Sequence, residues 1–274
     1  MTSVAVLGAG KMGEALLAGL LKSGHPGDDL CFTERYQGRA AEVTERLGLA
    51  RKDVAEAAAT ADVLFLAVKP QDIDPLLAEL AEGLGAAPRA GTVVVSLCAG
   101  LPTGLFEARL PVGTSVIRVM PNTPMVVGEA MSVMSPGRTA TDEQLDEVER
   151  LLGAVGRVLR VPESQQDAVT ALSGSGPAYF FYLAEAMIEA GVLVGLSRTV
   201  AAELVVQTAL GSARMLRESG EHPVALREAV TSPAGTTAMA IRELDARGAR
   251  AAVTAAVQAA RDRSVELGNT LHTA

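Results

Sequence analysis

The stretch "VAVLGAGKMGEAL", residues 4–16, sets the fold because it joins an apolar β-branched run to an amphipathic segment through three glycines. Gly8, Gly10 and Gly13 have the G-x-G-x-x-G spacing. In a strand-turn-helix unit the first glycine permits the tight turn and the second admits a pyrophosphate to the backbone. The third lets the helix pack on the strand. We therefore predict a dinucleotide site here rather than a merely glycine-rich turn.

Strand and helix patterns alternate outward from this motif to about Val161. The expected strands are Val4–Leu7, Leu30–Thr33, Val63–Val68, Thr92–Leu97, Ser115–Val119, Met131–Met134 and Arg157–Val161, and the expected helices between the early ones are Met12–Lys22, Arg39–Leu47 and Asp74–Glu82. Such alternation predicts a mostly parallel sheet with helices on both faces. We predict an α/β, Rossmann-type doubly wound domain over residues 1–162.

Residues 163–274 are expected to form an all-α domain, because the strand signal stops after Pro162. Glycine and proline divide this half into expected helices at Pro177–Gly195, Arg198–Ser219, Pro223–Val230, Thr237–Arg247 and Ala249–Leu267. Ser197 is an expected N-cap, and Gly220, Gly248 and Gly268 are expected C-caps. The helices have little polar face, so we infer that this domain packs against a copy of itself.

The net charge of −8 and the pI near 5.0 argue against nucleic acid or an anionic membrane as the main partner. Cys31 and Cys98 lie in apolar runs, where buried free thiols of a cytoplasmic protein are the simplest interpretation. The N-terminus shows no signal-peptide pattern. Glu185 and Glu189 interrupt the most apolar long run, which indicates a buried helix rather than a membrane span.

The cofactor choice is left open by the residues that end the second strand. Glu34 suits the ribose hydroxyls of NAD, whereas Arg35 with Thr33 could accept the 2′-phosphate of NADP. Lys69 and Pro70 follow a later strand, where they suit either a cofactor contact or a plain strand terminator. Asn122 lies in a rigid "MPNTP" turn suited to the nicotinamide end, or in a purely structural turn.

A hydroxy-acid dehydrogenase of this architecture needs a general acid/base, which is usually a lysine on the helix between the two domains. No lysine follows Lys69 in this chain, so that helix has none. His222 precedes a proline as a helix cap would, and His272 lies two residues from the C-terminus, so neither is a convincing base. The candidates that remain are the carboxylate of Glu163 and the hydroxyls of Ser173, Ser175 and "TSPAGTT", residues 231–237. Such a site suits a carboxylate-bearing protonated imine, which needs hydride but no strong base.

Taken in order, "GAGKMG", "AVKPQ", "RVMPNTP", "ALSGSGPAYFF", "GEHP" and "TSPAGTT" resemble the pyrroline-5-carboxylate reductase family over essentially the whole chain. The resemblance implies reduction of L-1-pyrroline-5-carboxylate to L-proline with NADPH, NADH being possible, and no metal. It also implies a homodimer built by interleaved C-terminal helices, often five dimers in a decamer.

The family's site residues can be carried over onto matching positions. Its cofactor contacts fall on Leu7, Gly8, Gly10, Lys11, Met12, Thr33, Glu34, Arg35, Val68, Lys69, Cys98, Ala99 and Gly100. Gly13, Pro70 and Asn122 are further expected cofactor residues because of their places in the motifs above. Its substrate contacts fall on Glu163, Ser232, Gly235, Thr236 and Thr237, with Thr237 the catalytic hydroxyl that holds the ring nitrogen or carboxylate. Ser232 or Thr236 is expected to cap the helix that follows, turning its N–H groups toward the substrate carboxylate.

The sequence departs from the family pattern at two positions. Ala234 stands where a second glycine is usual, and Ala229 replaces an asparagine that often contacts the cofactor.

Two alternative functions stay open. The chain could be another cyclic-imine or keto-acid reductase of the same architecture, which comparative turnover would reveal. It could also be a non-catalytic NAD(P)-binding regulator, which would bind cofactor without oxidising it.

Overall fold

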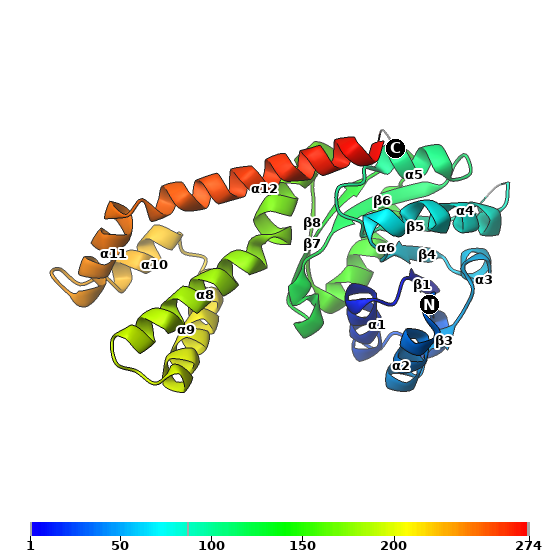
Figure 1. Ribbon diagram of the computed structural model, residues 1–274. Coiled ribbons are helices and arrows are strands. Elements are labelled where there is room, and N and C mark those ends of the chain that lie inside the picture. Colours follow the sequence, from blue (N-terminus) through cyan, green and yellow to red (C-terminus); the bar gives the residue numbers. More distant parts are fainter. Residues whose placement is uncertain (1, 87, 273–274) are drawn as a thin grey trace. The chain divides into compact units, whose positions relative to one another are not determined.

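The computed structural model describes residues 2–86 and 88–272, and its contacts divide them into two compact units (Figure 1). The sheet unit consists of the described parts of Met1–Ser175 and Ala260–Ala274, and the helical unit is Gly176–Ala259. Residues 163–175 therefore pack with the sheet. The functional domain boundary at Glu163 stays a prediction.

An eight-stranded sheet forms the centre of the sheet unit. Its strands are β1 (Val4–Leu7), β2 (Leu30–Thr33), β3 (Ala50–Arg51), β4 (Val63–Leu66), β5 (Val93–Ser96), β6 (Ser115–Met120), β7 (Ala130–Pro136) and β8 (Gly156–Arg160). The order is β3-β2-β1-β4-β5-β6-β7-β8, and pairing is parallel except between β6 and β7. The chain direction across the sheet reverses between β1 and β4, which is the switch point where such sheets bind ligands.

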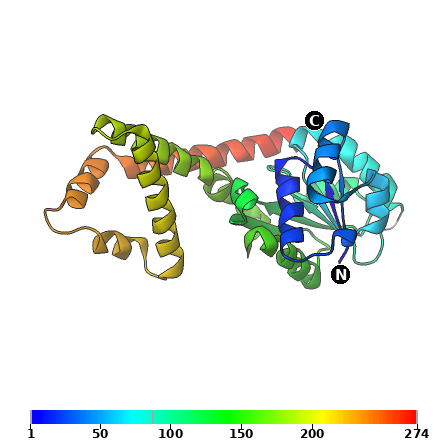
Figure 2. The same cartoon turned by 90° about the horizontal axis from the view of Figure 1, so that it is seen from below.

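Helices cover both faces of this sheet, as the view from below also shows (Figure 2). One apolar cluster joins the strands to α1 (Lys11–Lys22), α2 (Gln37–Leu47) and α6 (Asp142–Leu152). The other joins them to α3 (Val54–Thr60), α4 (Ile73–Leu84) and α5 (Thr103–Arg109). Because β1, β2, β4 and β5 are buried on both faces, they read as continuous apolar runs.

The helical unit follows a short α7 (Gln166–Val169) and a π-helical turn (Thr170–Gly174). It contains α8 (Gly176–Leu193), α9 (Arg198–Glu218), α10 (Pro223–Ala229) and α11 (Thr236–Ala246), and α12 (Ala249–His272) begins in it. Ser197 caps α9 by accepting from the Val200 amide at 3.3 Å, as predicted. His222 caps α10 in the same way through Nδ1.

The expected C-caps divide into two that are correct and one that is wrong. Gly220 and Gly248 have φ of +69° and +72°, as glycines that end helices do. Gly268 instead lies inside α12, which continues to His272. A Cβ on Gly268 would come within 3.1 Å of the Gly100 carbonyl, so this glycine permits close packing rather than a helix end.

Within the described residues, no helix is long and apolar enough to cross a membrane.

Candidate functional site

The glycine loop has the geometry that its sequence predicts. Gly8 has φ of +105°, a conformation that L side chains rarely adopt. A Cβ on Gly13 would lie 2.1 Å from the Gly8 carbonyl, so this glycine lets α1 pack on the loop. Gly10 is the N-cap of α1 without a side-chain cap, and a Cβ there would meet no atom of the described residues within 4 Å. The start of α1 therefore has open space beside it for a phosphate group.

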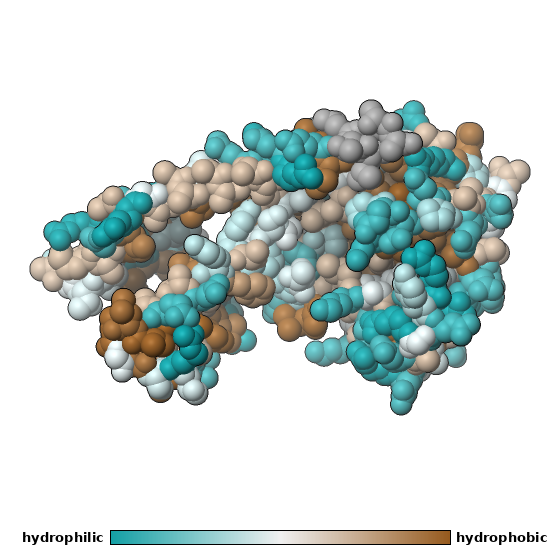
Figure 3. All heavy atoms as spheres, in the orientation of Figure 1, coloured by the Kyte–Doolittle hydropathy of each residue, from teal (hydrophilic) through white to brown (hydrophobic). Residues whose placement is uncertain are grey.

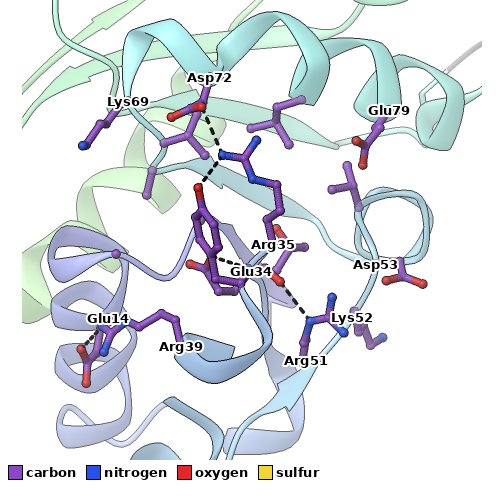
Figure 4. Close-up of a pocket in the computed structure, with 18 of the residues that line it drawn as sticks. Glu14, Glu34, Arg35, Arg39, Arg51, Lys52, Asp53, Lys69, Asp72 and Glu79 are labelled. Carbon is purple, nitrogen blue, oxygen red and sulfur yellow. Dashed lines mark hydrogen bonds and ion pairs between the residues drawn. The ribbon is translucent and has the colours of Figure 1, made fainter. Parts of the chain in front are cut away.

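A cavity of about 950 Å³ opens at the carboxyl ends of β1, β2 and β4 (Figure 4). Its volume suits a small-molecule or cofactor site. Eight of the predicted cofactor residues line it: Gly8, Gly10, Lys11, Thr33, Glu34, Arg35, Val68 and Lys69. Leu7 is buried in the core, and Met12, on the first turn of α1, packs against the core. Gly13, Pro70, Cys98, Ala99, Gly100 and Asn122 are also absent from the lining.

Charged side chains that the sequence did not single out complete the cavity wall. They are Glu14, Arg46, Arg51, Lys52, Asp53, Asp72 and Glu79. Arg39, which also lines the cavity, folds back to donate from Nε to the Ala9 carbonyl at 3.0 Å, and it pairs with Glu14. Arg46 pairs with the same carboxylate at 2.5 Å. These two arginines hold α2 against α1, so Arg39 has a structural role as a paired charge.

The loop after β2 holds its side chains in a defined arrangement. Glu34 accepts from the Tyr36 amide at 3.0 Å, and Arg51 donates to the Glu34 carbonyl at 3.1 Å. The Arg35 guanidinium lies 5.1 Å from the centre of the Tyr36 ring and donates to the Tyr36 hydroxyl at 3.2 Å. It also reaches Asp72, in the turn after β4, at 3.4 Å. Figure 4 shows this contact spanning the two loops.

The loop after β5 is tied to its neighbours within the sheet unit. Burial is the main reason that the pKa of the Cys98 thiol rises to about 11, and its Sγ lies 3.4 Å from the Val68 carbonyl. A thiol in that state is an inert packing group. Gly100 has φ of +79° and lies against α12 near Gly268. This loop borders the carboxyl ends of the strands and does not line the cavity.

The side-chain amide of Asn122 is engaged at both ends inside the sheet unit. Its Nδ2 donates to the Ser173 carbonyl at 3.1 Å, and its Oδ1 accepts from the Met131 amide at 2.9 Å. Ser173 lies in the π-helical turn, where a carbonyl can lose its regular helical partner. Asn122 thus holds the "MPNTP" turn against the segment that precedes α8.

Glu163 is held at the N-terminus of α5. Its two carboxylate oxygens accept from the amide and the hydroxyl of Thr103, each at 2.7 Å. The buried Arg118 guanidinium lies 3.4 Å from the same carboxylate. A carboxylate at the start of a helix compensates the helix dipole and satisfies free N–H groups. The structure therefore gives Glu163 a structural partner that the sequence did not reveal.

The "TSPAGTT" segment forms a tight turn before α11 in the helical unit. The Gly235 amide donates to the Ser232 carbonyl at 3.0 Å, and Ala234 between them has φ of +59°. Proline second and a positive φ third is the pattern of a type II turn. The expected cap is wrong: neither Ser232 nor Thr236 caps α11. Gly235 is its N-cap, without a side-chain hydrogen bond, and Thr236 and Thr237 are its first two residues.

This geometry has close relatives among known proteins. The chain is 47% identical to the pyrroline-5-carboxylate reductase of Mycobacterium tuberculosis, over 97% of each chain. It belongs to the pyrroline-5-carboxylate reductase family. The structure of the family member from Coxiella burnetii is similar, with a TM-score of 0.91 and 36% identity over 97% of this chain and 98% of that one.

Further comparisons divide along the same two parts of the reductase chain. Residues 163–267 match the family "Pyrroline-5-carboxylate reductase dimerisation", and residues 3–100 match "NADP oxidoreductase coenzyme F420-dependent". The Plasmodium falciparum pyrroline carboxylate reductase, whose structure has NADP bound, has a TM-score of 0.85 and 28% identity over 97% of this chain and 98% of that one. This reductase is therefore a nicotinamide-dependent oxidoreductase with a Rossmann-type domain and a helical dimerisation domain.

Proposed function

We propose that this chain reduces L-1-pyrroline-5-carboxylate to L-proline, with NADPH as the preferred cofactor. The observation that carries the proposal is the cavity at the glycine loop, in a chain 47% identical along nearly its whole length to a reductase of that name. When bound, the reduced nicotinamide supplies a hydride. The hydride and its electron pair add to the carbon of the protonated C=N bond, and the nitrogen becomes a neutral amine.

The substrate residues in this proposal are those of the turn before α11 together with Glu163. The Ser232–Gly235 turn leaves the first N–H groups of α11 without a side-chain cap, and such groups attract a carboxylate. The Thr237 hydroxyl, on the first turn of that helix, would orient the ring nitrogen or carboxylate. Glu163 would add a negative charge that favours the protonated imine, with Thr103 and Arg118 holding it in place.

The cofactor residues in this proposal are the cavity-lining glycine loop, the end of β2 and the end of β4. Arg35, Arg51 and Lys52 give the adenosine end of the cavity three cationic side chains, which favours a 2′-phosphate. Glu34 is the feature that favours the free ribose hydroxyls of NADH. The NADP-bound relative supports the phosphorylated cofactor for this chain.

The acting form in this proposal is a homodimer in the cytoplasm, with five dimers assembled into a decamer. Many large apolar side chains are exposed on the helical unit, and the match to a dimerisation family covers it. Figure 3 shows apolar side chains gathered where α8 meets α9. A surface of that kind on a lone chain indicates an interface.

The proposal is tested by steady-state oxidation of NADPH and NADH with pyrroline-5-carboxylate, and by chemical detection of proline. We expect proline to form and kcat/KM to be higher with NADPH. Faster turnover of a six-membered cyclic imine or of a 2-keto acid would favour the related reductases. Cofactor binding without oxidation by any of these substrates would favour a regulator.

Thr237→Ala tests the proposed substrate contact. Loss of one hydrogen bond to a charged group predicts a fall in kcat/KM of roughly ten- to a hundredfold, with cofactor affinity unchanged. Thr254→Ala makes the same chemical change at an exposed position of α12 and is the matched control. Equal kcat/KM in both variants would remove Thr237 from the proposed site.

A further inference from the structure

The Arg35–Asp72 contact joins two loops that both line the nucleotide cavity. Arg35 comes from the end of β2 and Asp72 from the turn after β4, 37 positions apart in the sequence. The guanidinium is also held by the ring and hydroxyl of Tyr36. Figure 4 shows the guanidinium directed from its own loop toward the opposite one.

Arg35 lies where the adenosine end of a dinucleotide is expected. In sheets of this type the residues just past β2 contact the adenosine ribose, and an arginine there can accept a 2′-phosphate. A planar guanidinium suits phosphate through paired N–H donors. In the structure, however, a donor that would serve such a phosphate is directed at the carboxylate of Asp72 instead.

Other cations of the cavity are engaged differently. Arg39 and Arg46 share Glu14, whose side chain is 13% exposed. Lys52 pairs with Glu56 within one short segment, at 3.5 Å. The Arg35–Asp72 ion pair is exposed to solvent on both sides, since its side chains are 65% and 37% exposed. An exposed ion pair of this kind is weak, so a phosphate dianion can displace it.

We propose that Asp72 is a specificity-determining residue, which competes with the cofactor 2′-phosphate for Arg35 and so limits the preference for NADPH over NADH. The inference rests on the proposed nicotinamide-dependent function and adds a residue to its cofactor site. Without a 2′-phosphate, the Arg35–Asp72 ion pair can stay intact at the adenosine end of the cavity. A 2′-phosphate must break this ion pair to bind Arg35, and the Asp72 carboxylate then remains as a nearby negative charge.

Asp72→Asn tests this role because it removes the charge and keeps the shape of the side chain. The dissociation constants of NADP⁺ and NAD⁺ are measured by calorimetry on the full chain, without substrate. We expect NADP⁺ to bind about three- to tenfold more tightly in the variant at low salt, with the gain shrinking as salt rises. NAD⁺ should change by less than about twofold, because no phosphate competes for Arg35.

Two further variants separate this competition from a general change of charge. Glu79→Gln removes the same charge from a cavity-lining position on α4, and it should shift the NADP⁺-to-NAD⁺ ratio less than Asp72→Asn does. In an Arg35→Gln background, Asp72→Asn should lose its effect on the ratio. A gain that persists without Arg35, or an unchanged ratio in Asp72→Asn, would overturn the role of Asp72 and leave the proposed function standing. Failure of both nucleotides to bind would overturn the two together.

Discussion

At the scale of single residues, Cys98 shows how burial alone sets the chemistry of a side chain beside the cofactor cavity. Burial raises the pKa of its thiol from 9.0 to about 11, against the opposing effects of Ser96 and Val68. The thiol therefore stays protonated at neutral pH and does not act as a nucleophile. Cys98 therefore has a packing role at the end of β5. Because its thiol is buried and protonated, a cysteine there is compatible with a redox enzyme.

The pKa of Cys98 predicts a specific loss of stability at high pH. The unfolded thiol ionises near pH 9.0 and the folded one near 11. Between these values the folded state binds more protons than the unfolded state, so the free energy of unfolding falls as pH rises. Two pKa units correspond to roughly 2–3 kcal/mol.

The measurement is urea unfolding of wild type and Cys98→Ala across that interval. The difference in the free energy of unfolding between the two proteins should shrink by about 2 kcal/mol from pH 9 to pH 11. Comparing the two proteins cancels the titration of lysines and tyrosines. Parallel pH curves would show that the thiol is not protected by burial.

Residues whose roles are local were predictable from the sequence, and residues whose roles depend on distant partners were not. Gly8 and Gly13 owe their roles to a turn and a helix start within one short segment. Glu163 is held by Thr103, 60 positions away. Arg35 meets Asp72 through two separate loops of the sheet edge. Residue spacing in a motif does not predict contacts between residues so far apart in the sequence, because the chain must fold before these partners meet.

At the scale of elements, the turn between α10 and α11 carries backbone strain at Ala234. Within the described residues, Ala234 is the one non-glycine position with a positive φ, at +59°. The left-handed region costs an L residue roughly 1–2 kcal/mol relative to glycine. The sequence identified the unusual alanine, but it could not decide whether the turn needs a positive φ there. The structure shows that it does.

Ala234→Gly is expected to stabilise the protein by about 0.5–1 kcal/mol. Relief of the left-handed conformation outweighs the extra freedom that glycine gives the unfolded chain. Ala240→Gly, at an exposed position inside α11, makes the same chemical change where φ is helical and should destabilise by about 1 kcal/mol. Thermal unfolding of both variants checks the sign. A loss of stability in Ala234→Gly would mean that the turn is not strained.

The elements that the sequence analysis missed are short or depend on packing. β3 has two residues and α3 and α5 have seven each, too few for a clear periodic signal. The π-helical turn at Thr170–Gly174 has no sequence pattern of its own. α6 is the exception, since Thr141 and Gln144 form a capping box that a search for that motif would have found.

At the scale of the whole molecule, the family and the fold class were predictable because ordered motifs span the chain. The comparisons confirm both predictions. They confirm a nicotinamide cofactor, while the preference for NADPH stays a prediction. The substrate and cofactor residues also remain predictions, although the cavity brings eight of the cofactor residues together. Assembly is the feature that a single chain indicates least directly, because its sign here is an exposed apolar surface on the helical unit.

That surface leads to a prediction about oligomeric state. Phe181 is 69% exposed on α8 of the helical unit, and Val112 is 96% exposed on a loop of the sheet unit. Leaving many such side chains of α8 and α9 in water is unfavourable, because each fully buried apolar side chain contributes roughly 1.5–3 kcal/mol. We therefore expect wild type to be a dimer or a multiple of dimers by light scattering at micromolar concentration.

Phe181→Asp should shift the protein toward monomer, because it places a charge in the proposed apolar interface. Val112→Asp makes a comparable change outside the helical unit and should leave the mass unchanged. Helical circular dichroism of both variants distinguishes lost assembly from lost folding. If Phe181→Asp keeps the full mass, then α8 does not form the interface, and we would place it on other helices of residues 163–267, which match the dimerisation family. A monomeric wild type would contradict the proposed interface on any of these helices.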